Sequence, residues 1–255
     1  MDRMPILFVG HGSPMNAIED NEFSRAWTEA GKALPRPKAI LCVSAHWETP
    51  GTQVTAMEKP KTIYDFYGFP PELYAASYPA PGSPELARRV VELARPGRVA
   101  PDQNWGLDHG AWSVLSRMFP QADVPVVQLS LDRGRSPRGH YDLGRQLQPL
   151  RDEGILILGS GNIVHNLGMV VWDDRAFDWA VEFDGQVKQW IVDDNDGPIV
   201  EYDRQGQAAA LAINSAEHFK PLLYVLGART PGEPLAFFNE KVSMGSMSMR
   251  SMRFG

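Results

Sequence analysis

The 255-residue sequence contains little cysteine, no long apolar run and no block of basic residues. Its one cysteine, Cys42, has no partner for an intramolecular disulfide, so the fold does not depend on an oxidising compartment. No stretch approaches the roughly 18 apolar residues of a membrane helix, and the apolar run 5–9 is too short for a signal peptide. The net charge is -6, which argues against nucleic acid or an anionic membrane as a partner. We therefore expect a cytoplasmic protein.

Short apolar runs alternate with helical patterns along the chain. Continuous runs of this kind are typical of strands covered on both faces, and 51–57, which alternates weakly, suggests an edge strand. Helices are indicated where a capping serine precedes proline or where apolar residues recur at helical spacing. This alternation predicts a three-layer α/β fold, as one large domain or two small ones. The predicted strands are 6–9, 39–44, 124–131 and 155–158, and the predicted helices begin at Ser83 and cover 111–119, 143–150 and 177–191.

For two segments, the sequence allows two alternative interpretations each. Residues 58–82 are dense in Pro, Gly, Tyr and Phe, which predicts a long ordered loop over one end of the sheet. The loop is either a lid over a functional site or a packed surface loop. Residues 243–255 are rich in Met and Ser and form either a frayed tail or a strand docked near the site.

The placement of the six histidines is the most informative feature of the sequence. His11 directly follows the first predicted strand, His46 the second, and His165 follows the strand 155–158 through a Gly-Ser-Gly-Asn turn. Ligands of an open α/β sheet bind beyond the carboxyl ends of its strands, so these three side chains should converge. His109 and His218 each precede a predicted helix.

Converging imidazoles predict metal chemistry without choosing the reaction. Non-haem iron oxygenases use three protein ligands and keep positions open, and zinc hydrolases use a similar number with an activated water. An oxygenase, a zinc-dependent hydrolase or amidase, and a non-catalytic metal-binding protein all remain open at this point. We interpret His140 as an ordinary surface or core histidine and Cys42 as a small buried hydrophobe. The sequence has neither the P-loop pattern nor the G-x-S-x-G of serine hydrolases.

Seven motifs, in order along nearly the whole chain, resemble the class III extradiol ring-cleavage dioxygenases, specifically the 4,5-DOPA dioxygenase group of bacteria and plants. The resemblance implies one catalytic domain over 1–255, with a central mixed, mostly parallel sheet and helices on both faces. The motifs are Gly-His-Gly-Ser-Pro at 10–14, Ser-Ala-His-Trp at 44–47, Tyr-Asp-Phe-Tyr-Gly-Phe-Pro at 64–70, Tyr-Pro-Ala-Pro-Gly at 78–82, Asp-His-Gly-Ala-Trp at 108–112, Gly-Ser-Gly-Asn-Ile-Val-His-Asn-Leu at 159–167 and Glu-His-Phe at 217–219.

The resemblance also implies roles for individual histidines. His11, His46 and His218 would bind a metal, and His165 would be either the catalytic base or a fourth ligand. His109 would act as a second active-site histidine near the substrate. Related enzymes often use a glutamate as third ligand, so Glu217 beside His218 stays an alternative.

The reaction implied is the opening of a catechol ring with dioxygen. Fe(II) is expected for catalysis and Zn(II) in purified protein, because zinc binds such sites more tightly. The aromatic loop would contribute the substrate-binding side chains Tyr64, Phe66, Tyr67 and Phe69. Members of the group often carry His at the position of Tyr64, so the exact catechol stays open. The sequence does not indicate the oligomeric state.

Overall fold

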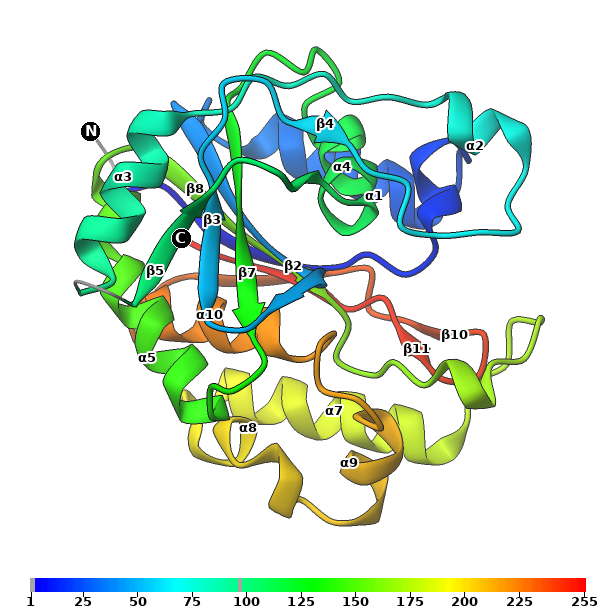
Figure 1. Ribbon diagram of the computed structural model, residues 1–255. Coiled ribbons are helices and arrows are strands. Elements are labelled where there is room, and N and C mark those ends of the chain that lie inside the picture. The colour runs from blue at the N-terminus through cyan, green and yellow to red at the C-terminus, as the bar shows by residue number, and fades with distance from the viewer. Residues whose placement is uncertain (1–2, 96–97) are drawn as a thin grey trace.

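The computed structural model describes residues 3–95 and 98–255, which form an α/β domain around an eight-stranded sheet (Figure 1). The strand order is β5-β3-β7-β2-β8-β1-β12-β9. In chain order these strands are β1 (Ile6–Gly10), β2 (Ala39–Thr49), β3 (Thr52–Thr55), β5 (Val99–Asp102), β7 (Val126–Asp132), β8 (Ile155–Gly161), β9 (Leu235–Phe238) and β12 (Ser251–Phe254). Two small ladders pair β4 (Lys61–Thr62) with β6 (Gly106–Leu107), and β10 (Val242–Ser243) with β11 (Met247–Ser248).

The centre of the sheet is parallel and its flanks are mixed. β2 pairs in parallel with β7 and β8, and β8 pairs in parallel with β1. The C-terminal segment adds β12 antiparallel to β1, and β9 antiparallel to β12. The mixed, mostly parallel α/β fold is therefore confirmed. Of the two structures considered for residues 243–255, the docked strand is the correct one.

Helices cover both faces of the sheet. Ile6 and Phe8 of β1 pack into one core cluster, and Leu7 and Val9 pack into a second one on the other face, as period-two alternation requires. The first cluster lies under α3 (Pro84–Leu93), α5 (Pro137–Leu147), α7 (Asp178–Val192) and α10 (Lys220–Ala228), and the second under α1 (Glu22–Ala33) and α4 (His109–Met118). Shorter helices are α2 (Pro71–Ala75), α6 (Pro149–Asp152), α8 (Gly197–Val200) and α9 (Gln207–Ala212), and 3-10 turns cover Pro14–Ala17, Leu167–Met169 and Tyr202–Arg204.

The structure corrects two details of the predicted fold. The segment 51–57 is not an edge strand, because β5 pairs outside β3 and takes the edge. The helix predicted over 143–150 ends at Leu147, and α6 begins separately at Pro149, since proline cannot donate an N–H to a continuing helix. Helix α1 and the strand β9 were not anticipated.

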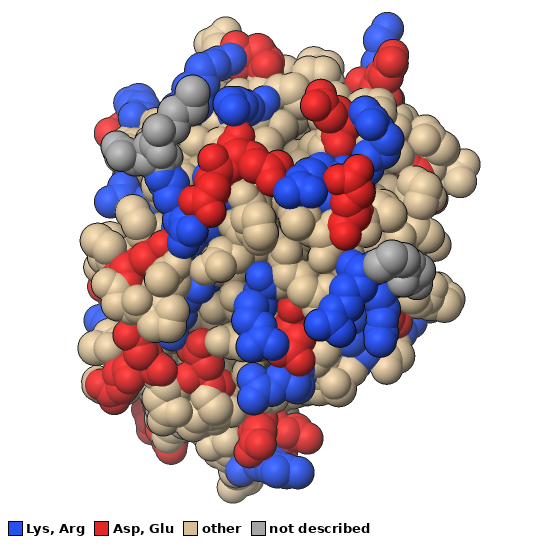
Figure 2. Space-filling model, turned by 90° about the vertical axis from the view of Figure 1, so that its left-hand side faces the viewer, with Lys and Arg blue, Asp and Glu red and all other residues tan. Residues whose placement is uncertain are grey.

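The segment 58–82 is a long ordered loop, as predicted, that carries only β4 and α2. Its two ends are tied together, because the N–H of Gly82 donates to the carbonyl of Glu58 over 2.8 Å. Within the described residues, we find no helix with both the length and the apolar character to cross a membrane. Acidic and basic side chains are interspersed on the face that carries α3 (Figure 2).

Candidate metal centre

Five imidazoles gather at the carboxyl edge of the sheet. The rings of His11, His46 and His218 lie 4.9–5.2 Å apart between centroids. His109 lies 3.9 Å from the ring of His46, and His165 lies 3.4 Å from the ring of His218. The structure therefore brings together all five histidines that the sequence singled out. One ring nitrogen each from His11, His46 and His218 lies within 4.8 Å of the other two, so these three residues could hold a metal ion.

His46 departs from the predicted position after a strand. It lies inside β2, which continues to Thr49, and the register of β2 against β7 shifts between Val43 and Glu48. Such irregularities re-aim side chains and are frequent beside active sites. The start of α4 approaches at the same point, where a Cβ on Gly110 would lie 2.9 Å from the His46 ring. Glycine at 110 therefore lets α4 and β2 meet.

The tautomer of His11 follows from its hydrogen bonds. The Ser160 hydroxyl donates to the carbonyl of Gly110 over 2.5 Å, so its one proton is used. Nδ1 of His11 lies 3.0 Å from the same oxygen and must donate to it. Nε2 of His11 is then bare, meaning that it carries no proton, and its lone pair faces Nε2 of His46 in the cluster.

In His218 and His46, as in His11, Nδ1 faces an oxygen of the protein and Nε2 does not. Nδ1 of His218 lies 3.0 Å from Glu217 Oε1, and Nδ1 of His46 lies 3.4 Å from Asp65 Oδ2. Carboxylates only accept, so Nδ1 of His218 carries the proton and its Nε2 is bare; the longer contact with Asp65 favours the same tautomer for His46. Metal-binding histidines are usually oriented by such a partner on the far nitrogen. Glu217, the alternative third ligand, is thus engaged with His218.

The chemistry of these nitrogens fits a cation. Nε2 of His46 lies 3.0 Å from Nε2 of His11, and Nε2 of His218 is buried with no hydrogen-bond partner among the described residues. Two facing lone pairs and an unsatisfied buried nitrogen are costly unless a shared positive charge lies between them. The donor set therefore suits a divalent metal that accepts imidazole ligands.

Electrostatics keep these rings uncharged. Burial and then the neighbouring histidines hold the pKa values of His11 and His218 well below the ordinary value. Burial and then His109 lower the pKa of His46 to about 3. Because a histidine must be neutral to bind a metal, the site keeps its ligands in the binding form at neutral pH.

His165 lies against the ring of His218, and one of its ring nitrogens forms a second group with His218 and Glu217 that could hold a metal ion. Its ring stacks on that of His218 with an interplanar angle of 9°, and its ring nitrogens make no hydrogen bond within the described residues. Burial lowers its pKa to about 4. A neutral, unengaged imidazole at this place is compatible with both predicted roles, catalytic base and fourth ligand.

Asp65 is a positioning residue that sequence reasoning did not single out. Its Oδ1 accepts the backbone N–H of His109 and its Oδ2 accepts from Nδ1 of the same residue, both at 2.9 Å. Burial alone would raise the pKa of Asp65, but these hydrogen bonds outweigh it and lower the pKa. Beneath it, Asp108 accepts from Ser44 over 2.6 Å, and burial together with the charge of Asp65 raises the pKa of Asp108 to about 6. Only the motif Tyr-Asp-Phe hinted at Asp65.

The four aromatic residues of the loop do not share one place. Phe66 packs 5.6 Å from the His109 ring and 5.3 Å from Phe69. Tyr64 contacts Phe66 at 6.1 Å between ring centroids and donates its hydroxyl to the carbonyl of Ala76. Tyr67 is 92% exposed and lies outside this group. Three of the four residues thus form a wall near His109.

Two cavities flank the histidine cluster. One, of about 540 Å³, is lined by His46 and His218 together with Ala45, Trp47, Glu48, Thr49, Trp105, Arg133 and Glu217. The other, of about 420 Å³, is lined by Phe69, Met247 and Met249 with residues of the first 3-10 turn and of the segment 172–174. The first cavity exposes two of the three proposed ligands, so we assign substrate access to it.

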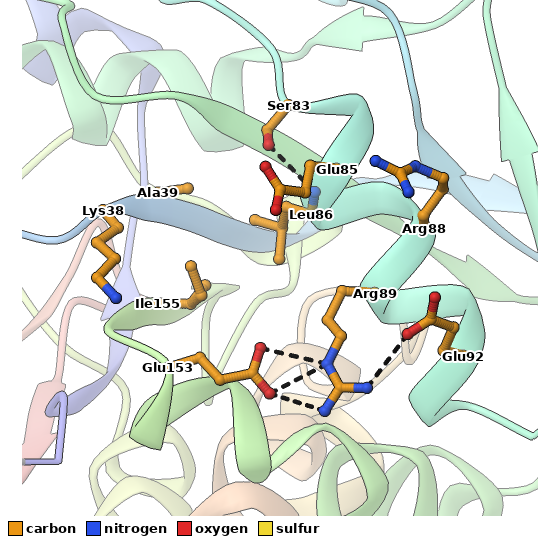
Figure 3. Close-up of a pocket in the computed structure, with 10 residues that line it drawn as sticks. All are labelled: Lys38, Ala39, Ser83, Glu85, Leu86, Arg88, Arg89, Glu92, Glu153 and Ile155. Carbon is orange, nitrogen blue, oxygen red and sulfur yellow. Dashed lines mark hydrogen bonds and ion pairs between the residues drawn. The ribbon is translucent and has the colours of Figure 1, made fainter.

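A further cavity of about 420 Å³ lies at the opposite, amino edge of the sheet (Figure 3). Arg89 there donates to Glu153 over 2.8 Å and to Glu92 over 3.2 Å. Lys38, just before β2, and Ile155, the first residue of β8, help to line it. Arg89 is paired with Glu92 and Glu153, whereas Lys38, Glu85 and Arg88 form no ion pair within the described residues. No histidine lines this cavity.

The two remaining predictions concern ordinary buried residues. His140 is buried on α5 and its Nδ1 lies 2.9 Å from the Tyr224 hydroxyl, apart from the other five histidines. Cys42 is buried within β2, and burial raises the pKa of its thiol well above the usual value. Both interpretations agree with the structure.

The chain is similar to known proteins over nearly its whole length. Residues 4–255 match the model of a family described as the catalytic LigB subunit of aromatic ring-opening dioxygenase. The chain is 51% identical over 260 residues to a 4,5-DOPA dioxygenase extradiol of Escherichia coli K12, covering 99% of this chain and 95% of that protein. It is 40% identical to the 4,5-DOPA dioxygenase extradiol of Beta vulgaris, covering 97% and 95%. A crystal structure of an uncharacterized Escherichia coli K12 protein superposes with a TM-score of 0.87 at 47% identity, covering 99% of this chain and 100% of that one.

Proposed function

Because this chain belongs to the family of the catalytic LigB subunit of aromatic ring-opening dioxygenase, and is an extradiol ring-cleaving dioxygenase, we propose that it opens DOPA-like catechols at the histidine cluster. The observation that carries the proposal is the trio of Nε2 atoms of His11, His46 and His218, each bare because its Nδ1 faces an oxygen. Family membership argues against the zinc hydrolase or amidase and against a non-catalytic metal-binding protein. A cytoplasmic location remains a prediction from the sequence.

The proposed metal is ferrous iron, held by His11, His46 and His218. A divalent iron bound by three neutral imidazoles would lower the pKa of a coordinated catechol hydroxyl and supply the redox chemistry with dioxygen. The protein's own part is to orient the three rings, which Ser160, Glu217 and Asp65 do through the far nitrogens.

We assign the proton transfers to the two remaining histidines. His165 would remove a proton from a substrate hydroxyl, because its ring nitrogens are free and it lies against a proposed ligand. His109 donates Nδ1–H to Asp65, which leaves its Nε2 without a proton and able to accept one from substrate or to hydrogen-bond a protonated oxygen species. Phe66 and Phe69, supported by Tyr64, would cover the ring and exclude water, and Tyr67 would join them only if the loop moved.

The test is oxygen uptake after anaerobic metal loading. Protein loaded with ferrous iron should consume oxygen with a panel of catechols and yield ring-opened products. Zinc-loaded protein should bind the same catechols and remain inert, because zinc has no redox chemistry. Equal turnover with zinc would contradict the redox role, and no turnover of any catechol with iron would contradict the proposed substrate class.

A further inference from the structure

We propose that Arg133 binds a carboxylate on the side chain of the substrate, so that the enzyme prefers catechols bearing an anionic substituent. The inference rests on the proposed function and adds to it a residue that determines specificity. It follows from the position of Arg133, from the charge balance of the cavity and from the shape of the cavity wall.

Arg133 lies at the functional edge of the sheet. It is the first residue after β7, and its N–H donates over 3.0 Å to the carbonyl of Thr49, the last residue of β2. β2 also carries His46, and β2 and β7 run in the same direction (Figure 1). Arg133 lines the 540 Å³ cavity together with His46 and His218. A ligand that reaches these histidines through this cavity therefore passes Arg133.

The charges of this cavity leave Arg133 available. Glu48 accepts from Lys220 over 2.7 Å, and Glu217 accepts from His218 and from Ser215 at 3.0 and 2.9 Å. Over residues 3–95 and 98–255, no acid lies within ion-pairing distance of Arg133. The nearby Arg135, by contrast, lies 3.7 Å from Asp132. The cavity thus presents one uncommitted cation beside engaged acids.

The wall of the cavity favours an aromatic body for the same ligand. The rings of Trp47 and Trp105 stack 5.5 Å apart with an interplanar angle of 2°, and both line the cavity. An aromatic ligand that enters here passes these indole surfaces before its ring reaches the histidines, where Phe66 and Phe69 would cover it. A guanidinium pairs with a carboxylate through two parallel hydrogen bonds. The combination selects an aromatic diol whose substituent ends in a carboxylate.

The experiment compares 3,4-dihydroxyphenylpropionate with its methyl ester, which differ in charge and share the ring. With iron-loaded enzyme, Arg133→Gln should lower kcat/KM for the acid about fivefold to tenfold and leave the ester within about twofold, since an exposed ion pair is screened. Arg133→Lys should recover part of the loss. Arg88→Gln is the matched control, because it removes the same charge at the amino-edge cavity (Figure 3). It should leave kcat/KM unchanged for both the acid and the ester.

A second readout does not require turnover. Zinc-loaded protein is titrated without oxygen, and tryptophan fluorescence reports binding because Trp47 and Trp105 line the cavity. The dissociation constant of the acid should rise in Arg133→Gln by the same factor, and that of the ester should not. An equal loss for both compounds, or no loss for either, would overturn the assignment. If the wild-type enzyme bound the acid through Arg133 but opened no catechol, the proposed function would fail separately.

Discussion

The cavities at the two edges of the central sheet differ in the kind of polar group that they leave without a partner. At the amino edge, Arg89 places its donors on Glu153 and Glu92, so these charges are satisfied within the protein (Figure 3). At the carboxyl edge, the imidazoles use one nitrogen on the protein and leave the other bare. The cavities are of similar size, about 420 and 540 Å³. The lesson is that unused ligand atoms, rather than volume, identify the functional edge.

The largest expected effect comes from removing a bare nitrogen. His11→Ala, His46→Ala and His218→Ala should each lose bound metal and essentially all turnover, because each deletes one of three converging ligand atoms. Metal content by elemental analysis and oxygen uptake would measure this. His140→Gln, which changes a histidine outside the cluster, should keep its metal. Full metal occupancy in any two of the three alanine variants would refute the ligand assignment.

A smaller effect is expected at His165, whose nitrogens are free but whose ring lies beside a ligand. His165→Ala should retain iron and lose turnover by about 10²- to 10⁴-fold, the usual contribution of a positioned base. Iron content and single-turnover rates distinguish the two roles. Iron loss as large as that of His11→Ala would instead make His165 a fourth ligand.

The third effect concerns stability at a histidine that binds no metal. Burial and then the charge of Lys220 lower the pKa of His140 to about 3, below the ordinary 6.5. The unfolded chain therefore binds an extra proton between these values, and stability falls as the pH drops through about 6.5. Between pH 7 and pH 5 the wild type should lose about 2 kcal/mol more than His140→Gln. Urea unfolding at both pH values would measure the difference, and equal losses would exclude the effect.

The smallest effect is expected at the amino edge. Arg89→Gln removes ion pairs to Glu153 and Glu92 that lie on the protein surface. Surface pairs of this kind contribute little, so the melting temperature should barely move and kcat/KM should stay unchanged. A loss of metal or turnover in this variant would mean that the two edges are coupled, and would contradict the assignment of function to the carboxyl edge alone.

The sequence predicted the convergence of His11, His46 and His165 because parallel strands share one carboxyl edge. It did not predict the partners that orient the rings. Asp65 reaches His109 across 44 residues of separation and Ser160 reaches His11 across 149, which no local pattern encodes. The register shift in β2 that carries His46 was equally invisible, because it depends on pairing with β7.

The antiparallel strand β12 has a consequence for the order in which the chain matures. Gly10, next to His11, donates its N–H to the Ser251 hydroxyl across 241 residues, and its Cα packs so close to Met249 that a Cβ there would lie 2.6 Å from the Met249 carbonyl carbon. His11 is the first histidine of the chain to be synthesised, but the contacts beside it at Gly10 are complete only after Met249 and Ser251 have been added. Contacts of such separation are slow to form, because closing the long intervening loop costs conformational entropy. We therefore expect the proposed metal to bind after the domain has been synthesised and folded, so that the metal acquired is the one available at that stage.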